Sequence, residues 1–555
     1  MTATIHDVKD KSFDYIICVL VLEAGAAHTG DMDILRPACY GSHFGKAEYC
    51  WNHETIKQEL TGNVSHFWQR GKGLGGSSAI NFLCWIKPPA KEVDDFERLG
   101  NPGWNWKNYE KYIRRTERFT PPSEEVQSAL GMNFENWSLG TDDALERWAL
   151  SGSEANERRG TYFAPCTYDL KTHTRSYAAT AFYLPNKDRP NFTVLVSAQV
   201  NRVIPSSDDD GESDFTAELV EFEYEGQVYT VHAKKEIILC AGALKTPQLL
   251  ELSGIGNSTV LRKLGLPIKV DLPGVGRNVQ EHVLVAVSFE LKDDVKFETL
   301  DILADPETLQ QHLDLHSEGS GLFTTGIIGF SFATLSQISP KADEIVKATE
   351  EKIWKNAKNY PPGLLEQYKL LLDRLRNSAG CEFISFPGML SRPNPPKKGK
   401  RYVSFSVALN HTFSRGNIHA ASKDPAVDPK IDPHYFEEEV DLLVWIEMVK
   451  FARNLRNISP LKEMTTEELN PGPDVQTDAE IAAWIKSIMT TTWHTASSCS
   501  MLPKALGGVV DPELKVYGTT NLRVVDLSVV PLHVAAHPQS TVYAIAEQDL
   551  SLEEI

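Results

Sequence analysis

The sequence lacks the features that mark several large classes of protein. No apolar run approaches the roughly 18 residues that a membrane-spanning helix needs, and residues 1–12 lack the apolar core of a secretory signal. The eight cysteines show neither CxxC nor Cys/His metal spacing, and we find no repeats or low-complexity segments. We therefore expect a cytoplasmic protein with reduced thiols, without a membrane partner and without a metal site.

Positive charge is also scarce. Lys and Arg number 56 against 75 Asp and Glu, which gives a net charge of −19. A surface of this sign repels nucleic acid and anionic membranes, so neither is expected as a partner. The 555 residues, of which 41% are hydrophobic, suffice for two substantial globular domains. Composition leaves the oligomeric state open.

Strand and helix patterns are mixed along the chain. Residues 13–25 form a continuous apolar run that ends in Glu-Ala-Gly, which is typical of a buried parallel strand. Further strands are expected over residues 191–204, 217–231, 235–239 and 402–410, and helices over 105–119, 247–252, 342–375 and 441–455. This mixture predicts an α/β nucleotide-binding domain interleaved with an antiparallel substrate domain.

Three segments indicate more than a generic α/β protein. The first is GKGLGGSSAINFLCWIKPPAKEVDDF, residues 71–96, and the second is GALKTPQLLELSGIG, residues 242–256. The third, residues 493–539, contains GGVVDPELKVYG and LRVVDLSVVP between two histidines. The first two resemble the signature segments of the glucose–methanol–choline (GMC) oxidoreductases. The third resembles the carboxyl-terminal catalytic segment of fungal members of this family, such as glucose oxidase.

The resemblance implies a GMC-type, Rossmann-like FAD-binding domain and an α+β substrate domain built on an antiparallel sheet. The first domain is expected over residues 13–100, 190–285 and 490–555, and the second over 101–189 and 286–489. The implied reaction is FAD-dependent oxidation of a small-molecule alcohol by hydride transfer, in fungal secondary metabolism of aromatic or polyketide compounds. The substrate, and the choice between oxidase and dehydrogenase, stay open.

Small residues in the first segment suit a cofactor site. In GGSS, residues 75–78, they let the backbone approach a flat ring and supply N–H and hydroxyl donors. Glu23 stands at a strand end, where an acid accepts ribose hydroxyls. With the contacts that the resemblance implies, the expected cofactor-binding set is Glu23, Ala24, Gly75, Ser77, Asn81, Phe82, Leu83, Cys84, Val200, Trp493, Asp526, Leu527, Pro538 and Gln539.

Two histidines match the active-site positions of the family. Oxidation of an alcohol requires a base for the hydroxyl proton, and the pKa of histidine lies near working pH. The resemblance implies that His494 accepts this proton. It implies that His537 hydrogen-bonds the same oxygen and supports the alkoxide-like transition state. Relatives often continue HxxGT, whereas this chain reads HTASS; small residues replace small ones, so we expect the same backbone path.

One part of the family pattern is missing. GMC proteins open with a strand, a glycine-rich turn, a helix and a second strand that ends in Leu-Glu-Ala-Gly. Here FDYII and VLVLEAG are separated by Cys18 alone. Adjacent parallel strands need a crossover of about a dozen residues or more, so the βαβ unit and its pyrophosphate-binding helix end cannot form. The sequence therefore predicts that this chain binds FAD weakly or not at all.

Alternative interpretations accompany the leading one. Gly71, Gly73 and Gly76 satisfy the G-x-G-x-x-G expression of an NAD site, but the residues before them do not read as a buried strand. A non-redox cyclase with the GMC fold stays open. So does a flavin-deficient, inactive homologue that arises by mis-splicing at the Cys18-Val19 junction, although the intact pair His494 and His537 argues against inactivity.

Overall fold

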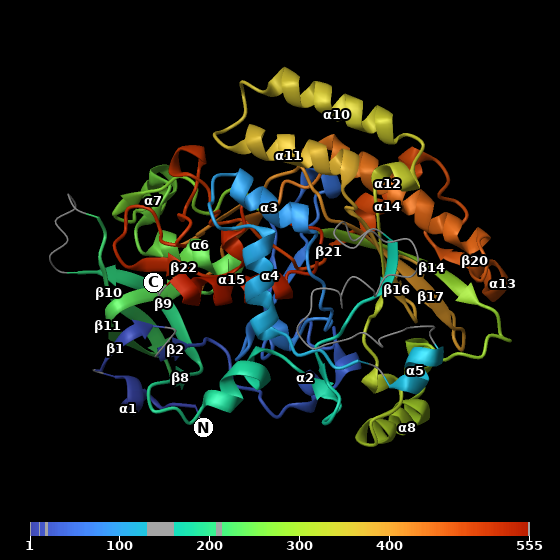
Figure 1. The fold of residues 1–555 in the computed structure, drawn as a ribbon, viewed down its shortest axis with the longest axis horizontal. Helices are drawn as coiled ribbons and strands as arrows, with labels where there is room; N and C mark the ends of the chain where they lie inside the picture. The colour runs from blue at the N-terminus through green and yellow to red at the C-terminus, as the bar shows by residue number, and fades with distance from the viewer. Residues whose placement is uncertain are drawn as a thin grey trace.

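Two sheets dominate the computed structural model, which describes residues 2–9, 11–16, 20–121, 123–129, 160–206 and 214–552. Within this part of the chain each sheet has seven strands. Figure 1 shows the first sheet on the left and the second on the right. Between them lie the helices α3 (Ala90–Arg98), α4 (Trp106–Thr116) and α15 (Gln539–Leu552). The Cys18-Val19 junction lies outside the described residues.

The first sheet is mixed and has the order β8-β2-β1-β11-β10-β9, with β22 paired to β11. Its strands are β1 (Ser12–Ile16), β2 (Leu20–Leu22), β8 (Thr193–Leu195), β9 (Ala198–Pro205), β10 (Ala217–Tyr224), β11 (Gln227–Leu239) and β22 (Leu522–Val524). β1 runs parallel to β2 and β11, β2 is parallel to β8, and β22 is parallel to β11. Parallel strands from both ends of the chain thus form the nucleotide-binding type of sheet.

The strands β1 and β2 meet in an unusual way. Residues 13–25 were expected to form one strand, but the structure has two, separated by residues 17–19. Their pairing consists of Ile16 opposite Leu20, so β2 begins beside the place where β1 ends. Strands joined by so few residues cannot lie side by side along their length, because the chain must travel back before it can run parallel again. β2 therefore does not lie alongside β1 over the length of either strand.

The second sheet is antiparallel and has the order β20-β14-β17-β16-β15-β5, with β21 paired to β14. Its strands are β5 (Gly160–Phe163), β14 (Val283–Leu291), β15 (Gly329–Ala333), β16 (Cys381–Phe386), β17 (Tyr402–Leu409), β20 (Thr465–Asn470) and β21 (Thr490–Thr491). The two sheets confirm the predicted fold class. The residue limits of the two domains stay a prediction. β14 crosses the expected limit at 285, and β21 lies within the expected FAD-binding range but pairs with β14 in the second sheet.

Two-stranded ribbons and further helices complete the described part. The ribbons are β3 (Cys50–Glu54) with β4 (Phe67–Gly71), β6 (Tyr168–Asp169) with β7 (Thr174–Arg175), β12 (Ile255–Gly256) with β13 (Val270–Asp271), and β18 (Asn417–His419) with β19 (Lys430–Asp432). The helices are α1 (Ile5–Val8), α2 (Met32–Leu35), α5 (Glu124–Ala129), α6 (Gly242–Leu252), α7 (Ser258–Leu264), α8 (Pro306–Ser317), α9 (Leu335–Ile338), α10 (Ala342–Asn356), α11 (Leu364–Asn377), α12 (Glu439–Asn454), α13 (Leu461–Met464) and α14 (Asp478–Ile488).

The structure corrects the extent of one strand and one helix that were expected from the sequence. The expected strand 217–231 is a hairpin, in which Glu225 and Gly226 turn the chain with positive φ angles of 51° and 74°. The expected helix 247–252 begins five residues earlier, so Pro247 lies inside α6. Proline offers no N–H to the carbonyl of Ala243. The Ser498 hydroxyl donates to that oxygen instead, at 2.6 Å.

Helix α4 confirms the helix expected over 105–119 but is not only a surface helix. Asn105 caps it, because its side chain accepts a hydrogen bond from the backbone N–H of Asn108 at 3.1 Å. Tyr109, Tyr112 and Ile113 follow at helical spacing and are buried. The phenol of Tyr109 donates to Ser540 of α15 at 3.1 Å. One face of α4 thus packs inward against the carboxyl-terminal helix.

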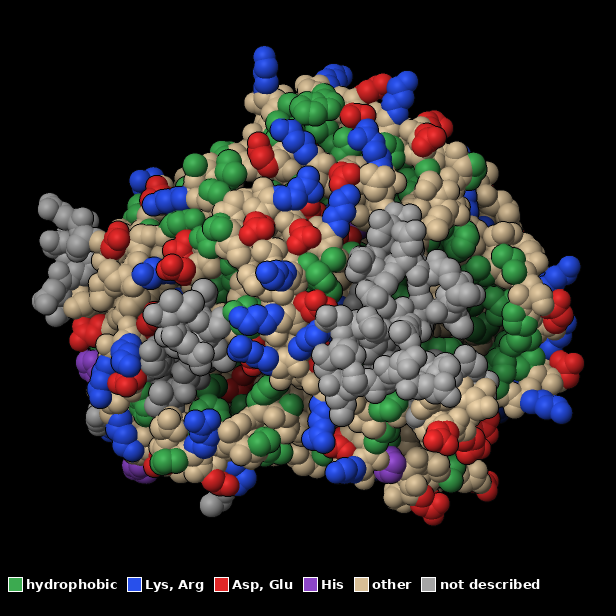
Figure 2. Space-filling view, in the orientation of Figure 1, with side chains coloured by type: hydrophobic (Ala, Val, Ile, Leu, Met, Phe, Trp, Pro, Cys, Tyr) green, Lys and Arg blue, Asp and Glu red, His purple; other side chains and the backbone are tan. Residues whose placement is uncertain are grey.

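The visible surface has no segregation of charge. Figure 2 shows Lys and Arg interspersed with Asp and Glu across this face. In the part of the chain that the structure describes, no helix combines the length and the apolar character needed to cross a membrane.

A buried ion cluster joins the two sides of the molecule. Arg374 of α11 is fully buried and contacts Asp95 at 2.8 Å and Glu92 at 3.6 Å, both on α3. Its guanidinium also donates to the carbonyl oxygen of His533 at 2.6 Å. His411 lies 2.9 Å from Glu92 and, with Arg374, holds the pKa of Glu92 at about 2 despite burial. The buried carboxylates of α3 are thus paired with Arg374 and His411, which come from the substrate side of the molecule.

We expect Arg374→Met to destabilise the protein by about 3–5 kcal/mol, because two buried carboxylates lose the buried guanidinium that they share, although Arg98 and His411 still contact them. Urea unfolding measures the loss. Arg376→Ala on the same helix is the control: Arg376 pairs with Glu350 at the surface, and loss of such a pair costs about 1 kcal/mol or less. Equal losses in the two variants would contradict the buried cluster.

Candidate active site

The structure brings the two predicted catalytic histidines together. His494 follows β21 and His537 precedes α15. Their ring centroids lie 5.0 Å apart, with the ring planes inclined by 60°. Both side chains are half-buried. Two imidazoles at this distance can act on the same small group placed between them.

Buried groups fix the backbone of His494 on both sides. Its N–H donates to Glu281 Oε1 at 2.7 Å, and its carbonyl oxygen accepts from His533 Nε2 at 2.7 Å. The other carboxylate oxygen of Glu281 accepts from the Thr495 hydroxyl, and Arg70 lies 3.7 Å away. The carboxylate therefore holds the segment that carries the first histidine.

A third histidine contacts the first. Nδ1 of His282 lies 3.0 Å from Nδ1 of His494, so one hydrogen is shared between two nitrogens. The His282 ring also stacks on His533, with centroids 3.8 Å apart. His282 is buried, and its Nε2 has no hydrogen-bond partner in the described residues. His282 can therefore influence which tautomer His494 adopts.

The second histidine has a carboxylate partner. Nε2 of His537 lies 3.0 Å from Glu382 Oε1, on β16, and the other oxygen of Glu382 accepts from Asn410 Nδ2 at 3.0 Å. The Glu382 side chain is almost fully buried. Phe330 meets the His537 ring edge-on, with centroids 5.3 Å apart. The ring is thus held by one hydrogen bond and one apolar wall.

Burial keeps the first histidine neutral. Desolvation, supported by the nearby His537, His533 and Arg70, holds the pKa of His494 well below its ordinary value. Burial and the neighbouring imidazoles do the same to the pKa of His282. A neutral imidazole has a free lone pair, which a proton acceptor needs.

The loop over residues 81–84 reaches the same region. Asn81 Nδ2 donates to Gln539 Oε1 at 2.9 Å, and Arg175 donates to Asn81 Oδ1 at 2.7 Å. Phe82 stacks with Trp493 at 6.1 Å and 3° between ring planes. Four members of the predicted cofactor-binding set, from three distant segments, therefore lie together beside His494.

Other members of that set lie around two touching turns. Glu23 Oε1 accepts from Gly25 N at 2.7 Å and from Gly73 N at 3.1 Å. Ala24 lies between Glu23 and Gly25 in the sequence and is partly exposed. Gly25 has no room for a side chain, since a Cβ there would lie 2.3 Å from Gly73 N. Burial raises the pKa of Glu23 to about 7.

The rest of the set has structural contacts of its own. Gly75 has φ +99°, and a Cβ there would lie 2.7 Å from the Tyr177 ring. Asp526 is committed to a cap: it accepts from Gly242 N, the Thr246 hydroxyl and Ser528 N at 2.6–2.9 Å. The remaining residues lie as follows: Ser77 accepts from Gly71 N, Leu83 and Cys84 are buried, Val200 is on β9, the Leu527 carbonyl accepts from Ser497 N, and the Pro538 carbonyl accepts from Val542 N.

Comparison with known proteins gives the family. Two GMC oxidoreductase family models match residues 19–284 and 412–546. The GMC oxidoreductase family protein Mala s 12 of Malassezia sympodialis is 32% identical, over 98% of this chain and 92% of its own length. The chain belongs to the GMC oxidoreductase family. GMC oxidoreductases are FAD-dependent enzymes that act on CH–OH groups.

Two further relatives support the assignment. A glucose oxidase of Aspergillus carbonarius is 30% identical, over 96% of this chain and 87% of its own length. The solved structure of an FAD-dependent oxidoreductase from Chaetomium thermophilum has 26% identity and a TM-score of 0.84, over 96% of this chain and 94% of that chain. The amino-terminal model match begins at residue 19, so β1 lies outside it.

The residues of this GMC chain fit the two ends of FAD unequally. Next to His494, the buried indole Nε1 of Trp493 has no hydrogen-bond partner in the described residues. The Gly75 turn, in the first signature segment, has no room for a side chain beside Tyr177. These features suit a flat, polar ring. At the other end Glu23 is present, but only residues 17–19 stand between β1 and β2. Three residues are too few for a helix between these strands, so no helix there can offer its amino terminus to a pyrophosphate.

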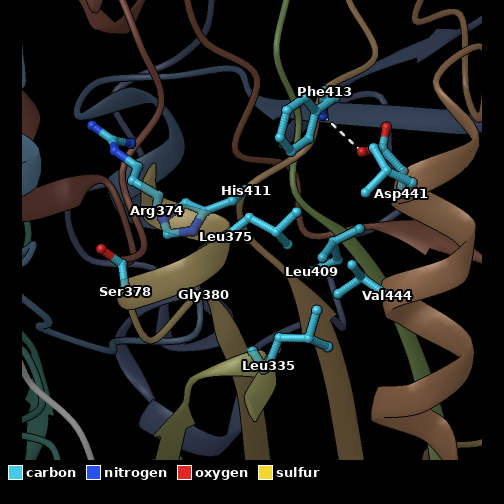
Figure 3. Close-up of a pocket in the computed structure, with 12 residues that line it drawn as sticks. Leu335, Arg374, Leu375, Ser378, Gly380, Leu409, His411, Phe413, Asp441 and Val444 are labelled. Atoms are coloured by element: carbon cyan, nitrogen blue, oxygen red, sulfur yellow. Dashed lines mark hydrogen bonds between the residues drawn. The ribbon is translucent and has the colours of Figure 1, made fainter. Parts of the chain in front are cut away.

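A separate cavity lies on the substrate side. Figure 3 shows it between α11 and α12, with His411 and Arg374 on one side and the Phe413–Asp441 hydrogen bond on the other. It encloses about 20 Å³, room for a single water molecule. Neither His494 nor His537 lines it.

Sequence reasoning missed His282, Glu382 and His533. A glutamate inside the apolar strand sequence CEFISF was a usable signal, since a buried charge requires a partner. His533 stands four residues before His537, in PLHVAAHPQ, and offered a weaker signal. The described residues contain no group of His, Cys, Asp or Glu arranged to hold a metal, although four histidines lie close together.

We expect His533 to make stability pH-dependent. Its Nδ1 accepts from Val534 N at 2.9 Å and its Nε2–H donates to the His494 carbonyl oxygen, which is the pattern of a neutral ring. Burial lowers the pKa of His533 to about 4, although the hydrogen bond to His494 opposes this shift. Below about pH 6.5 the unfolded chain takes up a proton that the folded chain does not. Stability contributed by this group is therefore lost as the pH falls, by about 1.4 kcal/mol per pH unit down to pH 4.

Urea unfolding of the wild type and of His533→Asn between pH 7.5 and pH 4.5 measures this effect. The stability difference between the two proteins should shift in favour of the variant as the pH falls. A difference that stays constant over this range would contradict the neutral, buried state of His533.

Proposed function

We propose that this chain oxidises a small-molecule alcohol, with His494 as the proton acceptor and His537 as the group that holds the alcohol oxygen. The observation that carries the proposal is the 5.0 Å separation of the two rings beside the Asn81–Gln539 contact. Bound FAD would supply the acceptor for the hydride of the carbinol carbon. The protein supplies the base, the positioning and the exclusion of water.

Which ring nitrogen of His494 carries the hydrogen depends on its contact with His282. If His282 donated the shared hydrogen, His494 would carry its own hydrogen on Nε2 and could not accept another there. If His494 donates through Nδ1, its Nε2 keeps a lone pair and can take the hydroxyl proton. The role of base therefore requires His282 Nδ1 to be the acceptor. His282 is then a positioning residue that sets the tautomer of His494.

The role of His537 depends on Glu382. Its Nε2–H donates to the carboxylate, so contact with the alcohol oxygen falls to Nδ1. To donate to a developing alkoxide, Nδ1 must also carry a hydrogen, and the ring is then an imidazolium. The Glu382 carboxylate, 3.0 Å away, compensates that charge. Glu382 thus supports the transition state through His537.

The cofactor-binding residues that we propose for this chain are those expected from the sequence, and they fall into two groups. Asn81, Phe82, Trp493 and Gln539 form the ring side, and Glu23 forms the ribose side. For Asp526 we propose contact through its backbone, since its carboxylate is occupied by three donors. The domain limits, a cytoplasmic location and a substrate from fungal aromatic or polyketide metabolism are proposals that rest on the family resemblance.

A second candidate is a flavin-poor member of the family. The observation that favours it is that β2 begins only four positions after the end of β1, which leaves too few residues for the glycine-rich turn and its helix. We expect the purified protein to carry well under one FAD per chain. Absorbance of the released flavin against protein concentration measures the ratio. A stoichiometric yellow protein would contradict this expectation.

We expect His494→Ala to slow flavin reduction by roughly 10²-fold or more, because the base is lost. The measurement is anaerobic bleaching of flavin-loaded protein by benzyl alcohol, ethanol or glucose, corrected for bound FAD. An unchanged rate would exclude His494 as the base. Turnover of an alcohol without bleaching would instead favour the non-redox cyclase.

His282 provides a sharper test. His282→Asn keeps an oxygen acceptor near the Nδ1 position, whereas His282→Ala does not. We expect His282→Ala to lower the reduction rate about tenfold or more and His282→Asn to recover part of it. His232→Ala, at an exposed histidine on β11, is the control. Equal rates in the Asn and Ala variants would contradict a tautomer-setting role.

A further inference from the structure

Two cysteines, one of them in the proposed cofactor-binding set, face each other. Cys84 ends the loop over residues 81–84, and Cys166 lies between β5 and β6. The two residues are partners in an isolated antiparallel bridge, and both thiols are free. The pair joins two segments that are more than 80 positions apart in the sequence.

The hydrogen bonds around the pair define its geometry. Trp85 N donates to the Pro165 carbonyl at 2.9 Å, and Thr167 N donates to the Leu83 carbonyl at 2.8 Å. Both bonds therefore join the residues that flank the cysteines, which makes the pair a non-hydrogen-bonded one. Such partners have Cα atoms about 4.5 Å apart and side chains on the same face. Disulfides need Cα atoms about 4.4–6.8 Å apart.

The thiols also converge on one acceptor. Sγ of Cys84 lies 3.7 Å from the Ile327 carbonyl oxygen, and Sγ of Cys166 lies 3.8 Å from the same oxygen; the Cys84 thiol also lies 3.3 Å from the Phe82 carbonyl oxygen. Gly326 closes over the pair, because a Cβ there would lie 2.5 Å from the sulfur of Cys166. Backbone spacing and thiol direction thus agree independently.

We propose that Cys84 and Cys166 form a redox-modification site that closes to a disulfide when the protein meets an oxidant of the disulfide class. The Cys166 thiolate, which is the less buried, attacks the reagent and forms a mixed disulfide, releasing one reagent thiol. The Cys84 thiolate then displaces the second reagent thiol. Two protein thiols become one disulfide, and the reagent takes up both electrons and both protons.

The bond would tie the cofactor loop to the segment that supports it. Leu83 has φ +63°, an unfavourable value for a residue with a side chain. Asn81 Oδ1 accepts from its N–H, and Arg175, downstream of Cys166, holds the same oxygen. A disulfide at Cys84 adds a covalent restraint to these hydrogen bonds. We expect the oxidised protein to unfold at a higher temperature than the reduced protein.

Closure should be slow at neutral pH. Burial raises the pKa of the Cys166 thiol to about 12 and the pKa of Cys84 well above its ordinary value. Only the thiolate reacts, so the closure rate should rise about tenfold per pH unit between pH 7 and pH 9.

The test uses the full-length protein incubated with oxidised glutathione at pH 8.5. Remaining thiols are alkylated with N-ethylmaleimide after denaturation, and the digest is analysed by mass spectrometry. The expected product is a Cys84–Cys166 cross-linked peptide, two hydrogens lighter than its reduced parts, with a higher midpoint of thermal unfolding. Reduction with dithiothreitol should reverse both changes.

Two variants make the result decisive. Cys166→Ser should abolish the cross-link and the thermal shift, whereas Cys381→Ser, at a buried cysteine on β16, should leave both intact. Alkylated Cys84 and Cys166 after prolonged oxidation would overturn the proposal. So would a cross-link of either residue to another cysteine in place of this one. Neither result depends on bound flavin, so the proposed alcohol oxidation is judged separately.

Discussion

Two buried carboxylates hold the backbone segments on which the histidine pair depends. Glu281 accepts from the N–H of His494, and Glu92 accepts from the N–H of Ala535, two residues before His537. Each carboxylate has an arginine close by, Arg70 in the first case and Arg374 in the second. A buried carboxylate that lost its cation would have to take up a proton or draw in water. The charge balance of these two carboxylates therefore also determines where the two imidazoles lie.

This constraint also links the two sheets. Glu92 lies on α3, within the first signature segment, whereas Arg374 and His411 come from the substrate side. Glu382, which holds His537, is on β16 of the antiparallel sheet. One histidine thus takes its support from main-chain contacts near β14, and the other takes a side-chain partner from the second sheet. The candidate active site lies at the boundary between the sheets.

Sequence reasoning reached the fold class and the family because signature segments impose local backbone requirements. Gly75 must adopt a positive φ, and Gly25 must let Gly73 approach, so these glycines are visible as a pattern. It did not reach His282 or Glu382, since their roles arise from contacts between residues more than a hundred positions apart. The start of α6 was also missed. Pro247 indicates a helix start by propensity, and only a distant hydroxyl makes it acceptable in the interior.

That hydroxyl has an effect beyond the helix. Ser498 belongs to the HTASS segment in which the chain departs from the HxxGT pattern, and its oxygen satisfies the carbonyl that Pro247 leaves open in α6. The second signature segment and the catalytic segment thus share one hydrogen bond, although about 250 positions separate them in the sequence. Neither position is free to vary alone. A backbone N–H at 247 would compete with the hydroxyl for Ala243, and an alanine at 498 would leave that carbonyl bare, so the two sites should change in concert during divergence.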